Sequence, residues 1–155
     1  MSRLSEDELA SIASSLAGEL KRGKNYVTIS VKRERVQEAC TRVASLPGFY
    51  HLSTISGVDL GQEIEVIYHF WKGRGFVAVK TKAPKSDPHV PSLSSALPSS
   101  LFYEVEVKDL LGVQFDGNPM MGQKLMLPDV YPVGAPPPLT KEADPKKIRR
   151  MMELE

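Results

Sequence analysis

The sequence predicts an α+β fold, in which two N-terminal helices pack on a mainly antiparallel four-stranded sheet and a proline-rich C-terminal arm follows. Three observations lead to this prediction. Apolar residues recur at helical spacing in two segments before residue 46, later segments alternate apolar and polar residues, and prolines become frequent after Ala83. One strand is expected between the helices and three after them.

The two predicted helices cover residues 6–21 and 33–45. The first follows a capping-box pattern, because Ser5 stands three positions before Glu8. The second has a narrow apolar stripe and ends before Pro47, since proline cannot continue a helix. The residues expected to face the core are Leu9, Ile12, Leu16 and Leu20 in the first helix and Val36, Ala39, Cys40 and Val43 in the second.

Four segments show the alternation that is typical of half-buried strands. The last two form the clearest hairpin, because the basic segment at residues 72–75 supplies glycines for positive φ. This segment lacks the spacing and the strand-to-helix context of a phosphate-binding loop, so a hairpin turn is the better interpretation. Residues 57–61 are expected to connect two strands. The predicted strands are residues 26–31, 49–55, 64–71 and 76–81.

Residues 101–111 are ambiguous by pattern alone. Val105-Glu106-Val107 alternates like a strand, whereas Gly112 stands where a glycine commonly ends a helix. The serine- and proline-rich stretch before this segment cannot hold a long regular element.

A second proline-rich stretch covers residues 118–138 and favours polyproline II geometry. Asp144-Pro145 is expected to cap a last short helix. The sequence therefore predicts a domain over residues 1–117 and an extended arm over residues 118–155.

Composition excludes several classes of function. The chain has 20 basic and 19 acidic residues and a formal net charge of +1, so it lacks a global field that would attract nucleic acid or anionic lipid. Its single cysteine, Cys40, rules out a disulfide framework or a cysteine-ligated cluster and fits a reducing, cytoplasmic setting. We find neither an apolar signal segment nor a run of about 18 apolar residues that could cross a bilayer, so any membrane association is expected to come through other subunits.

No side-chain motif predicts catalysis, a metal site or a cofactor site. His51, His69 and His89 lie on predicted strands or in a proline-rich loop, without a nucleophile motif and without a third metal ligand. Cys40 belongs to an apolar stripe, where a free cysteine acts as a small hydrophobic residue.

Two charged clusters leave alternatives open. Glu104, Glu106 and Asp109 could serve acid–base chemistry, but a solvated or partner-facing acidic surface is favoured. The basic cluster near the C-terminus could contact nucleic acid, which makes a stand-alone α+β nucleic-acid-binding module the alternative function. This cluster comprises Lys146, Lys147, Arg149 and Arg150.

Three ordered motifs carry a family resemblance. Residues 87–93 read DPHVPSL, residues 103–119 read YEVEVKDLLGVQFDGNP, and residues 125–129 read LMLPD. These motifs resemble the signature of the 30 kDa subunit family of respiratory complex I, the proton-pumping NADH:quinone oxidoreductase, and of the homologous subunit in membrane-bound hydrogenases. The strand with Val66-Ile67-Tyr68-His69 also resembles the sheet of that family.

The resemblance implies that residues 101–111 form a signature helix and that the protein is a non-catalytic assembly subunit of a cytoplasmic peripheral arm. The expected partners are a large hydrogenase-like subunit and an iron–sulfur small subunit, which would carry the iron–sulfur clusters and, in a hydrogenase, a nickel–iron centre. The carboxylates of the signature helix are expected to contact a partner or to anchor the helix. The implied interface consists of Tyr103, Glu104, Glu106, Asp109, Gly112, Phe115, Gly117, Pro119, Leu127, Pro128 and Asp129.

The charged part of the signature departs from the family pattern. Where the respiratory subunits have histidine–proline–aspartate followed by an arginine pair, this chain has Asn118-Pro119-Met120 and Gly122-Gln123-Lys124. Loss of these cations favours the branch that serves energy-converting nickel–iron hydrogenases over the NADH enzymes.

Overall fold

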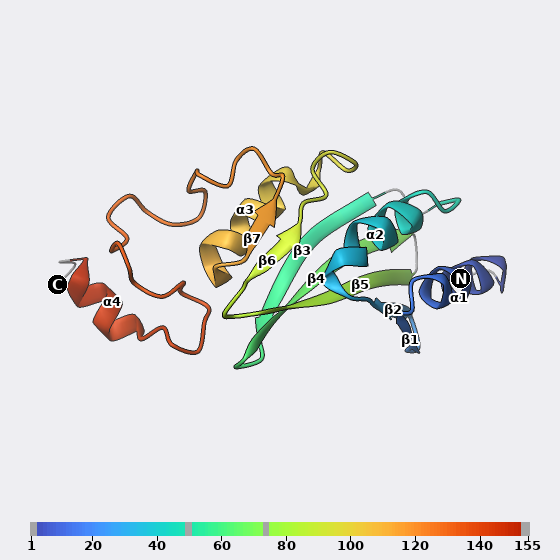
Figure 1. Cartoon of the computed structure of the whole chain (residues 1–155), viewed down its shortest axis with the longest axis horizontal. Helices are drawn as coiled ribbons and strands as arrows, with labels where there is room; N and C mark the ends of the chain where they lie inside the picture. The colour runs from blue at the N-terminus through green and yellow to red at the C-terminus, as the bar shows by residue number, and fades with distance from the viewer. Residues whose placement is uncertain (1–2, 49–50, 73–74, 153–155) are drawn as a thin grey trace.

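The computed structural model describes residues 3–48, 51–72 and 75–152, and its central element is a five-stranded sheet (Figure 1). The strand order is β1-β2-β5-β4-β3. Among the described residues, only the β2–β5 pair of this sheet is parallel, so the predicted α+β class and mainly antiparallel sheet are confirmed. The strands are β1 (Glu19–Arg22), β2 (Tyr26–Ser30), β3 (His51–Asp59), β4 (Glu63–Lys72) and β5 (Gly75–Pro84).

The sheet has one strand more than predicted, because the first helix is shorter than predicted. α1 covers Arg3–Ser15, so Ser5 lies inside the helix rather than at its N-cap. The chain then reverses through Ala17, which has a φ of 50°, and continues as β1. A Cβ at Gly18 would lie 2.8 Å from the Ser30 carbonyl oxygen, so glycine lets the chain turn close against the end of β2.

Leu20 shows why the apolar pattern is misleading here. The pattern predicts its side chain on the apolar face of the helix, but Leu20 lies on β1 opposite Ile29. A separation of four residues from Leu16 places both side chains on the same face of either a helix or a strand. Periodicity therefore does not place the end of α1.

The second helix covers the inner face of the sheet. α2 (Val36–Ala44) follows a 3₁₀ turn, η1 (Arg33–Arg35), and buries the predicted stripe. It packs chiefly against β5 and β4, while α1 packs against α2 and the β1–β2 pair. The inner-face side chains of the sheet in this core include Val27, Ile29, Val66, Tyr68, Phe70, Val77 and Val79.

The ambiguous segment is a helix, α3 (Ser100–Leu111). Gly112 ends it with a φ of 81° and donates its N–H to the Lys108 carbonyl oxygen at 2.8 Å. α3 packs so closely on β3 that a Cβ at Gly57 would lie 2.4 Å from Leu111 Cδ1. β3 continues to Asp59, so the connection predicted at residues 57–61 is shorter than expected.

The C-terminal part leaves the domain after a small parallel pair of strands. β6 (His89–Pro91) pairs with β7 (Gln114–Asp116), and residues 117–144 then contain neither helix nor strand. α4 (Pro145–Met151) is the predicted last helix, and Asp144 Oδ1 accepts the Lys146 N–H at 2.9 Å. In Figure 1 the described part of the arm, residues 118–152, carries α4 to the end of the molecule opposite α1. No helix in the described ranges is long and apolar enough to span a bilayer.

Candidate partner interface

The predicted interface residues differ in their exposure and in their contacts. Glu104, Asp109 and Phe115 are at most 3% exposed and make their contacts within this chain. For the two carboxylates this geometry is that of helix anchoring, one of the two roles expected from the sequence. Gly112 closes α3. The remaining positions are partly or fully exposed: Tyr103, Glu106, Gly117, Pro119, Leu127, Pro128 and Asp129.

Glu104 joins three separate segments. Its Oε1 accepts the Leu93 N–H at 2.6 Å, and its Oε2 accepts the Ser92 hydroxyl at 2.6 Å and the Asn118 side-chain amide at 2.8 Å. The segment after β6, helix α3 and the start of the arm are therefore held by one buried carboxylate. A buried carboxylate is costly unless hydrogen-bonded, and here three donors replace its water.

Two of these donors were not recognised as site residues from the sequence. Ser92 and Asn118 lie within the signature motifs. Asn118 departs from the histidine of the pattern that the motifs resemble, but its side-chain amide still donates an N–H to Glu104. We use the name Glu104 cluster for Ser92, Leu93, Glu104 and Asn118.

Asp109 fixes the arm about one and a half turns further along α3. Its Oδ2 accepts the N–H groups of Leu125 at 2.7 Å and Met126 at 2.9 Å, and its Oδ1 lies 2.8 Å from Lys108 Nζ. Burial raises the pKa of this carboxyl, but the Lys108 ammonium and the two N–H groups outweigh burial and leave the pKa below its ordinary value. Lys108 also donates to the Gln123 carbonyl oxygen, so both side chains hold the same part of the arm.

A second attachment holds residues 139–142. Asp59 Oδ2 accepts Lys85 Nζ at 2.6 Å and the Lys141 N–H at 2.7 Å. Lys85 Nζ also lies 2.7 Å from Glu142 Oε1, and the Leu139 N–H donates to the Leu110 carbonyl oxygen at 2.9 Å. The arm is therefore tied to its own domain at two places.

The acid sensitivity of the second attachment can be predicted. Hydrogen bonding from Lys85, then from the Lys141 N–H, lowers the pKa of Asp59 from 3.8 to about 2. A depressed pKa means that the carboxylate stabilises the folded state fully above pH 3.8 and that this contribution is lost as the pH falls toward 2. We expect the Lys141 amide to exchange faster with solvent deuterium over that interval, as measured by NMR.

The matching variant is Asp59→Asn, which we expect to exchange rapidly at the Lys141 amide already at neutral pH. In this variant the acid-dependent increase should be absent. An unchanged increase between pH 4 and pH 2, roughly, would assign the acid sensitivity to another carboxyl group.

Between the two attachments, the arm exposes apolar side chains. Val130 is 58% exposed and Val133 is fully exposed. A hollow of about 400 Å³ lies between this part of the arm and the C-terminal end of α3, and Lys108, Leu127 and Tyr131 contribute to its lining. The apolar surface is typical of a segment that is covered by a partner.

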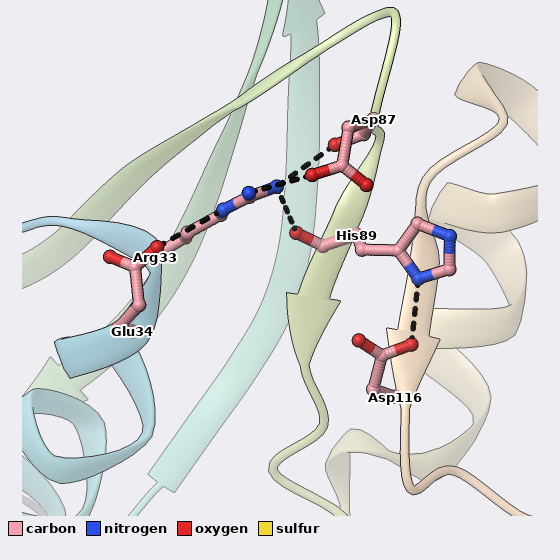
Figure 2. A network of polar contacts seen from close by, with 5 residues as sticks. All are labelled: Arg33, Glu34, Asp87, His89 and Asp116. Carbon is pink, nitrogen blue, oxygen red and sulfur yellow. Dashed lines mark hydrogen bonds and ion pairs between the residues drawn. The ribbon is translucent and has the colours of Figure 1, made fainter.

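A polar network ties the first signature motif to η1 (Figure 2). Arg33 Nη2 bonds Asp87 Oδ2 at 2.7 Å, its Nη1 donates to the carbonyl oxygens of Asp87 at 2.9 Å and His89 at 3.3 Å, and its Nε bonds Glu34 at 3.2 Å. His89 Nδ1 lies 2.8 Å from Asp116 Oδ1 and so links β6 to β7. The network positions the segment that supplies Ser92 and Leu93 to Glu104.

The other histidines show no assembled catalytic group in the part of the chain that the structure describes. His69 Nε2 lies 2.8 Å from Ser56 Oγ. Burial, and to a smaller extent the charge of Lys80, lowers the pKa of His69. Among the described residues, no carboxylate bonds the second ring nitrogen of His69. His51 pairs with Trp71 rather than with His69. Cys40 is buried, and burial raises the pKa of its thiol well above the ordinary range. No group of three or more potential metal ligands occurs among the described residues.

The fold and these contacts define a small α+β domain that holds and presents an arm. Comparison with known proteins gives the family: the respiratory-chain NADH dehydrogenase 30 Kd subunit family matches residues 29–148. The chain belongs to this family, which confirms the resemblance in the sequence motifs.

Individual relatives agree with the assignment. A subunit of the NADH-quinone oxidoreductase of Acidothermus cellulolyticus is 33% identical over 117 residues, covering 70% of this chain and 60% of the relative. The corresponding protein of Moorella thermoacetica is 30% identical, and the match covers 76% of this chain and 81% of the relative. A subunit of the F(420)H(2) dehydrogenase of Methanosarcina mazei is also 30% identical, and the match covers 64% of this chain and 65% of the relative. The chain thus spans less than two thirds of the length of the Acidothermus and Methanosarcina relatives.

Two solved structures share the fold. A chain of the membrane-bound sulfane sulfur reductase, an archaeal respiratory membrane complex, superposes with a TM-score of 0.80 at 24% identity, covering 96% of this chain and 91% of that one. A trypsin-resistant fragment of Nqo5 superposes with a TM-score of 0.62 at 26% identity, covering 74% and 97%.

Proposed function

We propose that this protein is a non-catalytic assembly subunit in the cytoplasmic peripheral arm of a membrane-bound redox complex. The observation that carries the proposal is the arm, which is tied to its domain at Asp109 and Asp59 and exposes apolar residues between these attachments. A segment held in this way loses little conformational entropy when it docks. Its partners are a large hydrogenase-like subunit and an iron–sulfur small subunit, and membrane association comes through other subunits.

The redox cofactors belong to the partners in this proposal. The large and small subunits carry iron–sulfur clusters and, in a hydrogenase, a nickel–iron centre. Family membership and the relatives named above support a respiratory type of complex, while the missing arginine pair after Asn118 favours the hydrogenase branch. The exposed arm fits either type.

Native mass spectrometry of the tagged chain, purified from its own host, tests the proposal. We expect a complex that contains a large subunit of the hydrogenase or quinone-enzyme type. Paired nickel-binding cysteines in that subunit would identify a hydrogenase, and their absence a quinone-type enzyme. Recovery of the chain alone, under conditions that keep the host's respiratory complexes intact, would overturn the proposal.

Charged residues on the exposed arm should prevent assembly. For the double variant Val130→Asp with Val133→Asp we expect at least about a tenfold lower recovery of the large subunit, because burying two carboxylates against a partner costs well over 1.4 kcal/mol. The isolated variant should unfold at the same temperature as the wild type, since both valines are exposed. Recovery is measured by quantitative mass spectrometry after tag purification.

Leu60→Asp is the matched control for this variant. Leu60 is a similarly exposed apolar residue, but it lies in the turn between β3 and β4. We expect the Leu60→Asp variant to recover as much of the large subunit as the wild type does. Equal losses for both variants would show that surface charge, rather than the arm, determines recovery.

The nucleic-acid alternative depends only on the basic residues of α4. Their side chains are exposed, as is usual for charged residues on a surface helix. Neutralising all four cations should leave recovery of the complex within about twofold, and the purified wild type should show no salt-dependent binding to oligonucleotides.

A further inference from the structure

The outer face of the sheet, turned away from α2, carries a row of three half-exposed aromatic side chains. Tyr26 is 54% exposed, Phe76 50% and Trp71 47%. Their strand neighbours Val27 and Val77 point the other way and are buried in the core. We call Tyr26, Phe76 and Trp71 the aromatic row.

The aromatic row runs straight across three adjacent strands. Tyr26 on β2 pairs with Phe76 on β5, and Phe76 pairs with Trp71 on β4. The rings of Trp71 and Phe76 stack with centroids 6.4 Å apart and planes 27° apart. Cross-strand stacking restricts both rings, so little side-chain entropy remains to be lost on binding.

Most of the rest of the outer face is polar, as is normal for the solvent side of an antiparallel sheet, although Val58 and Ile67 also lie on it. At its far end Lys80 pairs with Glu65 at 3.1 Å and Lys82 pairs with Glu63 at 3.4 Å. Cations there are balanced by carboxylates within the chain. The aromatic row is therefore a local apolar departure from a mostly charged and polar face.

Two cations lie at the β1 edge of the sheet beside Tyr26. Arg22 pairs with Val27, so its side chain leaves β1 on the inner-face side of this edge, whereas Lys24 lies in the turn between β1 and β2. Arg22 and Lys24 are exposed, and neither forms an ion pair within the described residues, whereas Lys21 is paired with Glu19 at 3.3 Å. Arg22, Lys24 and Tyr26 line a small hollow of about 120 Å³, and Glu6 also contributes to its lining. Aromatic residues together with arginine are the composition of binding hot spots in protein interfaces.

We propose that the aromatic row and the Arg22–Lys24 edge form a second docking surface, which binds a segment of a partner subunit whose apolar side chains are flanked by carboxylates. Apolar side chains would cover the three rings, and the carboxylates would pair with the two free cations. A single-stranded nucleic acid fits less well, because the paired charges beyond the row interrupt a continuous basic groove. The proposal rests on the proposed function in one respect: it needs a complex with partner subunits.

This surface lies far from the arm. In Figure 1 the β1–β2 end of the sheet and the arm are at opposite ends of the molecule. Three rings and two cations bury only part of the roughly 800 Å² that each side of a standard interface contributes, so this contact adds to the arm contact instead of replacing it.

Photocrosslinking in the native host tests the second surface. The variant Trp71→p-benzoylphenylalanine keeps an aromatic ring in the row, and Phe102→p-benzoylphenylalanine places the same group at an exposed position on α3. We expect position 71 to crosslink to a partner segment that mass spectrometry identifies as apolar and acidic. A crosslink from position 71 to a second copy of this chain or to nucleic acid, or no crosslink at all, would overturn the inference.

The two positions separate the inference from the proposed function. If neither position crosslinks and native mass spectrometry finds no complex, the proposed function fails and the second surface fails with it. If the complex forms and position 102 crosslinks to a partner while position 71 does not, only the second surface is wrong.

Charge reversal gives an independent measurement. Combined with Trp71→p-benzoylphenylalanine, the pair Arg22→Glu and Lys24→Glu should lower the yield of crosslinked partner about tenfold, because repulsion replaces two ion pairs. The control pair Lys32→Glu and Lys82→Glu changes the net charge equally at the far end of the outer face. Equal losses in both pairs would assign the effect to net charge and overturn the role of the Arg22–Lys24 edge.

Discussion

Replacing Glu104 with alanine should lower the free energy of unfolding by about 2–4 kcal/mol, the largest loss that we expect from a single polar substitution in this chain. The variant leaves the Leu93 N–H, the Ser92 hydroxyl and the Asn118 amide without their acceptor in a buried site. Chemical denaturation in urea, followed by tryptophan fluorescence, measures the loss.

Two further variants identify the cause. Glu106→Ala removes a partly exposed carboxylate two residues along the same helix and should change the free energy of unfolding by about 0.5 kcal/mol or less. Glu104→Gln keeps the shape of the side chain, but its NH₂ group would face the donors that Glu104 accepts from. We therefore expect its loss of unfolding free energy to lie between those of Glu104→Ala and Glu106→Ala. If Glu104→Ala and Glu106→Ala were equally destabilising, the loss of any carboxylate from α3, rather than the Glu104 cluster, would be responsible.

The regular elements were largely predictable because one face of each is buried. The stripe of α2 and the alternation along β4 and β5 are periodic, and their predicted positions match the structure closely. The end of α1 was not predictable, because Leu20 fits the periods of both structures. The helical state of α3 followed only from the family motif. Glu104 and Asp109 are charged but lie on the buried side of this helix, so the buried positions do not show up as an apolar pattern in the sequence.

The polar clusters could not be derived from the sequence for a different reason. Most donors to Glu104 and Asp109 come from residues at least 11 positions away, and several are main-chain N–H groups that every residue carries. From side-chain types alone, these carboxylates were therefore interpreted as part of a solvated or partner-facing acidic surface. The full aromatic row was likewise hidden. The predicted hairpin could place Trp71 beside Phe76, but Tyr26 joins them only through the parallel pairing of β2 with β5.

Replacing Asp109 with alanine should release the first part of the arm. The Leu125 and Met126 N–H groups lose their acceptor, and Lys108 loses its partner, so we expect a stability loss of about 2–3 kcal/mol. Hydrogen exchange at these two amides should accelerate by roughly 10- to 100-fold, because local opening no longer breaks charge-assisted hydrogen bonds. NMR-detected exchange measures both amides directly.

The pH dependence of the wild type provides the second half of this test. Since the pKa of Asp109 is depressed below 3.8, its carboxylate stabilises the arm fully above that pH, and the contribution disappears as the pH falls through the folded-state pKa. Protection of the Leu125 and Met126 amides should therefore decrease in acid in the wild type and be low and independent of pH in Asp109→Ala, after correction for intrinsic exchange. Asp129→Ala, which removes an exposed carboxylate of the same arm, should retain the wild-type profile. Loss of protection in Asp129→Ala but not in Asp109→Ala would contradict the attachment, and with it the idea that the domain presents its arm in a fixed position.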